Sequence, residues 1–110
     1  MSDRRWPKKL LRVQLTGEYA GFYFVWWRNA PIDWRGDLVR AVQANDDPLA
    51  LRAIWRCIVE HNFVDFDGNP LPPGGELSDA DLARIPGDLL GVIWSSLQNA
   101  VRDEQLPNEH

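Results

Sequence analysis

The sequence predicts a single α+β domain in which a small antiparallel β-hairpin sheet packs against about four α-helices. Three observations lead to this fold class: a length that suits one core, two strand-like segments joined by a turn, and several amphipathic helical segments after them. At 110 residues the chain can build one hydrophobic core. We therefore expect one domain over residues 10–102, a flexible basic arm at 1–9 and a frayed tail at 103–110.

The hairpin is predicted near the N-terminus. Residues 11–15 alternate apolar and polar side chains, which is the pattern of a half-buried strand. Residues 16–18 then form a turn, in which Gly17 tolerates a positive φ. Residues 22–27 are six bulky β-formers in a row and make the second strand.

The second strand has no polar face. Side chains alternate along a strand, so Phe22, Phe24 and Trp26 point one way and the other three point the opposite way. A small two-layer domain normally buries one face of its sheet. We expect the other face to bind a partner, unless the chain's own helices cover both. The sequence leaves open which face is exposed, so the partner-binding candidates are Phe22, Tyr23, Phe24, Val25, Trp26 and Trp27.

Two helices are expected next. Asp33 is a candidate N-cap for the first, which runs to about Ala44 with Leu38, Val39 and Val42 facing the core.

Asp47 is a candidate N-cap for the second helix, with Pro48 in its first turn, and Asn62 is expected to end it. Its apolar residues follow the helical spacing i, i+3, i+4, i+7, i+8, and they are Leu51, Ile54, Trp55, Ile58 and Val59.

The last third of the chain predicts a short hairpin and two more helices. The hairpin covers residues 63–71 around the Asp67-Gly68 turn. Ser78 and Asp81 have the spacing of a capping box and predict a short helix that ends near Ile85. The final helix starts at Pro86, and its apolar face is formed by Leu90, Ile93, Trp94, Leu97 and Val101.

Charge is divided unevenly along the chain. Residues 1–56 hold ten Lys and Arg against six Asp and Glu, a net charge of +4, and residues 57–110 hold two against ten, a net charge of −8. Opposite halves can attract copies head to tail, which predicts self-association. The alternative is chance patterning on solvated faces.

The sequence offers little for catalysis or metal binding. Cys57 and His61 are four residues apart in the second predicted helix and would share a face, but His110 is the only other histidine. Residues 65–76 resemble a calcium loop, yet Pro70 occupies the position that needs glycine. We expect no catalytic residues, no metal site and no cofactor. Hence the protein is predicted not to be an enzyme.

Targeting signals are also missing from the sequence. No apolar run suits a signal peptide or a membrane span, and the single cysteine fits a reducing compartment. We expect a soluble cytoplasmic protein. The basic residues of the arm with Trp6 allow an alternative, a small DNA-associated regulatory protein that uses the arm and the first two helices. The overall net charge of −4 makes nucleic acid a less favoured partner.

Short motifs along residues 8–102 resemble one known family. They are Tyr19-Ala20-Gly21-Phe22 in the hairpin, Asp47-Pro48 between the helices, residues 62–71 (Asn-Phe-Val-Asp-Phe-Asp-Gly-Asn-Pro-Leu) and residues 85–90 (Ile-Pro-Gly-Asp-Leu-Leu). In this order they resemble the tail assembly chaperones of long-tailed phages.

The resemblance implies a non-catalytic role in virion assembly. Such chaperones are made in the host cell cytoplasm, bind the tape measure protein, keep it soluble and help recruit tail tube subunits. Some members also exist as longer frameshifted forms. A neighbouring alternative is a structural component that stays in the virion tail.

Overall fold

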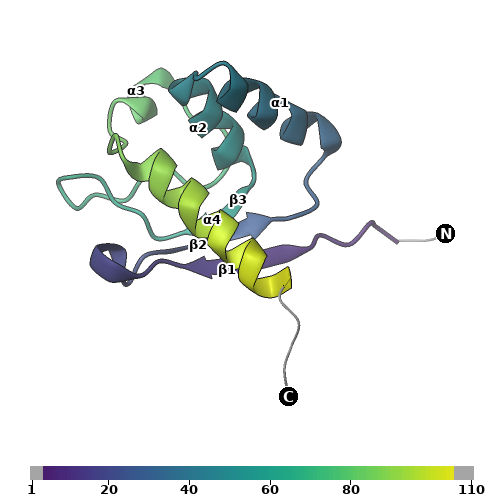
Figure 1. Cartoon of the computed structure of the whole chain (residues 1–110). Helices are drawn as coiled ribbons and strands as arrows, with labels where there is room; N and C mark the ends of the chain where they lie inside the picture. Colours follow the sequence, from purple (N-terminus) through teal and green to yellow (C-terminus); the bar gives the residue numbers. More distant parts are fainter. Residues whose placement is uncertain (1–3, 106–110) are drawn as a thin grey trace.

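The computed structural model describes residues 4–105, which form a three-stranded sheet and four helices (Figure 1). The predicted small α+β class is confirmed. The elements in chain order are β1 (Leu10–Gln14), the 3₁₀ turn η1 (Gly17–Tyr19), β2 (Tyr23–Trp27), α1 (Ile32–Gln43), α2 (Asp47–Arg56), β3 (Ile58–His61), α3 (Asp79–Leu82) and α4 (Leu89–Gln105). Residues 1–3 of the predicted arm and 106–110 of the predicted tail lie outside the described residues, whereas residues 103–105 belong to α4.

The predicted hairpin forms from β1 and β2. The two strands are antiparallel, with a register that runs from Leu10 opposite Trp27 to Gln14 opposite Tyr23. Gly17 begins the connecting 3₁₀ turn with φ of +68°, a conformation that favours glycine. Tyr19, in the same turn, donates a hydrogen bond of 2.9 Å to Asp88 and so ties the hairpin to the segment that leads into α4.

A third strand replaces the end of the predicted second helix, so the expectation that this helix continues to Asn62 is wrong. Helix α2 ends at Arg56 with Cys57 as its C-cap. Strand β3 begins at Ile58 and pairs antiparallel with β2, which gives the sheet order β1-β2-β3. Ile58 and Val59 are β-branched and suit a strand as well as a helix. The free edge of β2 pairs with Ile58, Glu60 and His61, and this pairing favours the strand.

The loop at residues 72–75 fixes the point where α2 ends. Gly75 donates its N–H to the carbonyl of Trp55 at 3.0 Å, which occupies one of the last helical acceptors. Gly74 passes so close to β3 that a Cβ atom there would lie 1.7 Å from the carbonyl oxygen of Ile58. The carbonyl of Pro72 also lies 3.2 Å from Nε1 of Trp55 and 2.7 Å from Nε2 of His61. One loop therefore holds the end of α2 and the end of β3 together.

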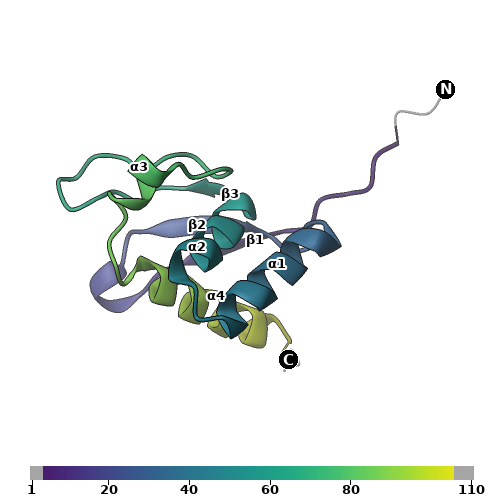
Figure 2. The same cartoon turned by 90° about the horizontal axis from the view of Figure 1, so that it is seen from above.

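The helices α1, α2 and α4 lie on one side of the sheet (Figures 1 and 2). The core between them is centred on four fully buried side chains: Phe24, Ile54, Trp55 and Ile93. Of the residues predicted to face the core from α1, only Leu38 does so. Val39 and Val42 are 54% and 45% exposed, because α1 packs mainly on α2 and uses Leu38 and Ala41 for that contact.

The predicted helix caps are correct in part. Pro31, not Asp33, occupies the N-cap of α1 and makes no side-chain cap, so Asp33 lies in the first turn. Asp46 rather than Asp47 caps α2, and its carboxylate accepts the N–H of Leu49 at 3.1 Å.

The capping box of α3 is confirmed. Asp81 donates its N–H to Oγ of Ser78 at 3.1 Å, and Ser78 donates its N–H to the Asp81 carboxylate at 2.9 Å. Helix α3 ends at Leu82, earlier than predicted, and α4 starts three residues after Pro86. None of the helices in residues 4–105 combines the length and apolar character that a membrane crossing requires.

Candidate functional site on the open face of the sheet

The structure assigns the two sets of side chains on β2 to different surroundings. Phe24 is fully buried, and Phe22 and Trp26 pack against the same core. The alternate residues Tyr23, Val25 and Trp27 are half-buried and belong to the opposite face of β2, where Trp27 at its end also reaches Trp34 of α1. We call this surface the open face, and it consists of Leu10, Arg12, Gln14, Tyr23, Val25, Trp27 and Glu60.

Charged side chains partly cover Tyr23. Its hydroxyl donates a short hydrogen bond to the carboxylate of Glu60 on β3, and the guanidinium of Arg12 on β1 lies 4.0 Å from the ring centroid. The hydrogen bond to Glu60 raises the pKa of Tyr23 above its ordinary value of 10.0, because the bond requires the protonated hydroxyl. All three strands thus contribute one side chain to this cluster.

Trp27 occupies the other end of the open face. The ammonium of Lys8 lies 4.4 Å from its ring centroid, and Trp34 of α1 meets it edge-on with centroids 5.4 Å apart. The indole N–H donates to Oδ1 of Asn29 at 3.1 Å. Asn29 also accepts the N–H of Lys9 at 2.7 Å and donates to the carbonyl of Pro7 at 2.9 Å. These bonds hold residues 7–9 against the sheet and place Lys8 over the indole.

On the open face, the basic side chains of Lys8 and Arg12 lie over the aromatic rings of Trp27 and Tyr23. A cation over an exposed aromatic ring is worth roughly 0.5–1 kcal/mol, so the Lys8 contact with Trp27 is easily exchanged for a partner's side chain. Long basic side chains cover apolar surface while their charge stays in water. This arrangement leaves apolar ring surface close to solvent with basic side chains over it.

The geometry assumed for a Cys57–His61 site is not present. Cys57 is the buried C-cap of α2 and His61 lies on β3, so the two do not share a helix face as predicted. Burial raises the pKa of the Cys57 thiol, which lowers its reactivity. The described residues contain no group of three or more His, Cys, Asp and Glu side chains placed to hold a metal ion.

The calcium-like segment is a turn held by its own side chains. Asp65 accepts the N–H groups of Asp67 and Asn69, each at 2.9 Å, and forms an ion pair with Arg84 at 3.0 Å. The Asn69 N–H and then Arg84 lower the pKa of Asp65. Gly68 has φ of +84°, as the predicted Asp-Gly turn requires. These contacts use the carboxylate within the turn.

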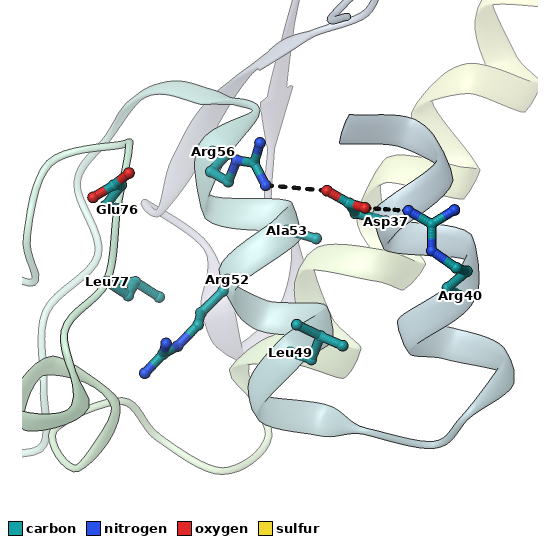
Figure 3. Close-up of a pocket in the computed structure, with 8 residues that line it drawn as sticks. All are labelled: Asp37, Arg40, Leu49, Arg52, Ala53, Arg56, Glu76 and Leu77. Carbon is teal, nitrogen blue, oxygen red and sulfur yellow. Dashed lines mark hydrogen bonds and ion pairs between the residues drawn. The ribbon is translucent and has the colours of Figure 1, made fainter. Parts of the chain in front are cut away.

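An arginine-lined hollow of about 580 Å³ lies between α1, α2 and the loop before α3 (Figure 3), and sequence reasoning missed it. Asp37 accepts from both Arg40 and Arg56, the latter at 3.3 Å, and Arg52 pairs with Asp79. Three of the arginines that a phosphate backbone would use in the first two helices, Arg40, Arg52 and Arg56, are thus already paired with carboxylates. This counts against the DNA-binding alternative.

Comparisons with known proteins add no relative. A scan against models of known protein families and searches of curated proteins and of solved structures found no match to this chain. The resemblance to tail assembly chaperones therefore stays a prediction from short motifs, and the function is argued from the residues and their geometry.

Proposed function

We propose that this protein is a phage tail assembly chaperone that binds the tape measure protein through the open face of its sheet and helps tail tube assembly without catalysis. The observation that carries the proposal is the face of β2 opposite the core, which presents Tyr23, Val25 and Trp27 beside two cations. The choice of family in this proposal rests on the short motifs along residues 8–102.

The physical demands of that role match this surface. A tape measure protein is long and helical, and it exposes apolar stripes until the tube surrounds it. A chaperone for such a rod needs apolar area that binds without high affinity at any single site, because many copies bound along one rod give avidity. Aromatic side chains at the centre of a contact, with a polar rim, supply most of the energy in such contacts. The host cell cytoplasm is the proposed location, since assembly takes place there.

Coexpression tests the proposal. The chain is expressed together with a phage tape measure protein, and co-purification and solubility of that protein are measured for wild type, Trp27→Ala and Phe66→Ala. Phe66 is 86% exposed on the 64–70 loop, away from the open face, and is the matched aromatic control. We expect Trp27→Ala to reduce co-purification about tenfold and Phe66→Ala to leave it unchanged.

Three outcomes would contradict the proposal. The first is a failure of the wild-type protein to bind or solubilise the tape measure protein. The second is equal binding by Trp27→Ala and Phe66→Ala, which would remove the open face from the contact. The third is recovery of the protein in finished virions, which would favour a structural tail component.

A further inference from the structure

Two adjoining hollows lie between α1 and α4, on the side of the sheet that carries the helices. One has a volume of about 320 Å³ and the other about 300 Å³, and Trp94 lines both. We call the pair the α1–α4 groove. Its apolar walls include Val39, Val42, Leu90, Trp94, Leu97 and Val101, and Trp26 and Trp27 line it where it meets the sheet.

The groove exists because α2 separates the other two helices. Helix α2 packs against both α1 and α4, and α1 packs mainly on α2 (Figures 1 and 2). The residues that line the second hollow include Ala41, Ala50 and Gly91, whose side chains are too small to fill it. The result is a channel with an apolar lining instead of a closed helix interface.

The exposure of Val39 and Val42 has no explanation within the folded chain. Both belong to the apolar face of α1, and such a face is normally buried against another element. Here the two β-branched side chains are 54% and 45% exposed along the groove. β-Branched residues also favour helices less than unbranched ones do, so their presence on a solvated helix face is costly.

Opposite charges mark the two ends of the groove. Arg35 lines the end beside Leu97 and Val101, and Asp47 lines the end beside Leu90. Residues 35–43 of α1 rise about 12 Å, or a little over two helical turns. A helix of that length therefore meets a positive charge at one end and a negative charge at the other.

We infer that the α1–α4 groove binds an amphipathic helix of a partner protein, with an acidic first turn against Arg35 and a basic last turn against Asp47. Its apolar residues at i, i+3, i+4 and i+7 enter between Val39, Val42 and Trp94. Acidic first and basic last turns also suit the helix's own dipole. The inference goes beyond the proposed function, since it concerns a second surface and needs no tape measure protein.

A labelled synthetic peptide tests the inference. The probe is a helical peptide of about 18 residues, with leucines along one face, glutamates in its first turn and lysines in its last. A second peptide has the two charged turns exchanged. Fluorescence anisotropy titrations measure both dissociation constants at low salt. We expect wild type to bind the first peptide about tenfold more tightly, and the double variant Arg35→Glu/Asp47→Lys to prefer the second.

Two single variants identify the surface. Val39→Glu should weaken binding of the first peptide about tenfold or more, whereas Leu49→Glu should not change it. Leu49 is a matched control because it is 47% exposed on α2 and lies outside the groove. Thermal melts of both variants should match wild type, since both positions face solvent. If Val39→Glu melts early, the charge-exchanged double variant and the two peptides still give the answer.

The inference is overturned if wild type binds both peptides equally or neither of them. It is also overturned if Val39→Glu and Leu49→Glu bind alike in their folded states. Loss of binding in Tyr23→Ala with normal binding in Val39→Glu would place the peptide on the open face and would equally refute the groove, because Tyr23 lines neither hollow. None of these outcomes depends on the tape measure protein, so failure here leaves the proposed function to its own experiment.

Discussion

Trp26 and Trp27 are neighbours in the chain, yet Trp26 packs against the core and Trp27 lies under the ammonium of Lys8 on the open face. This division predicts different effects for two similar truncations. Trp26→Ala should lower the free energy of unfolding by about 2 kcal/mol or more, because it removes core contacts. Trp27→Ala should leave the melting temperature close to that of wild type and reduce co-purification with the tape measure protein. Thermal melts and pull-downs of both variants check this, and equal loss of stability in both would contradict it.

Gly74 should tolerate no side chain. A Cβ atom there would lie 1.7 Å from the carbonyl oxygen of Ile58, and both groups are backbone and cannot move independently. Gly74→Ala should therefore cost more than about 3 kcal/mol or prevent folding. Gly91→Ala is the control, because nothing lies within 4 Å of its Cβ position in α4. It should raise stability by roughly 0.5–1 kcal/mol through helix propensity, as urea titrations would show.

His61 should make stability depend on pH near neutrality. Its Nδ1 accepts the N–H of Phe63 at 3.0 Å, so Nε2 carries the proton and donates to the carbonyl of Pro72 at 2.7 Å. Burial lowers the pKa of His61 below its ordinary value of 6.5, against a smaller opposing effect of Pro72. As the pH falls through 6.5, His61 is protonated in the unfolded chain before it is protonated in the folded protein, so the free energy of unfolding decreases. It stops decreasing once the pH is below the pKa of His61 in the folded protein.

Melting curves between pH 8 and pH 5 measure the effect of His61. His61→Gln should show a smaller loss of melting temperature over the range in which the histidine titrates. The remaining histidine, His110, is common to both proteins and so cancels in the comparison. Identical slopes for wild type and variant would show that His61 is not held in its neutral form.

Cys57 should behave as an inert core residue. It is 3% exposed, and burial raises the pKa of its thiol. Modification by a thiol reagent should be slow in the native protein and fast in denaturant, while Cys57→Ala should cost about 1–2 kcal/mol. Stoichiometric zinc in the purified protein, lost in Cys57→Ala or His61→Ala, would instead revive a metal site.

Self-association should depend on salt. The N-terminal half of the chain carries a net charge of +4 and the C-terminal half −8, so copies attract one another head to tail. Exposed charges are screened beyond about 10 Å at 0.1 M salt. Sedimentation velocity should therefore show concentration-dependent oligomers at low salt that dissociate as salt rises. A strict monomer at high concentration under both conditions would refute this.

The parts of the fold that local patterns determine were predictable. Alternation and a glycine turn gave the hairpin, and the spacing of Ser78 and Asp81 gave the capping box. The boundary between α2 and β3 was not predictable in this way, because Ile58 and Val59 satisfy both the helical and the strand pattern. Its position depends on the free edge of β2 and on the loop at 72–75, both remote in sequence.

The candidate site was predictable only as a pair of alternatives. The alternation along β2 defined two sets of side chains, and the side of the sheet on which the helices pack decides which set is exposed. The residues of β2 alone do not determine which face of the sheet the helices cover. The placement of Arg12 over Tyr23 depends on strand register, and that of Lys8 over Trp27 depends on Asn29, so neither followed from a motif.

The sheet order also constrains the sequence of folding events. Strand β2 pairs with β1 across a short turn, but it pairs with β3 only after the chain has passed through α1 and α2. Local contacts form faster than those that close a long loop. We therefore expect the hairpin and the α1–α2 pair to form first and β3 to dock after the rate-limiting step. Substitutions at Glu60 or Val59 should therefore alter the folding rate less than substitutions in the hairpin turn. Strand β3 should be the last part of the sheet to gain protection from hydrogen exchange.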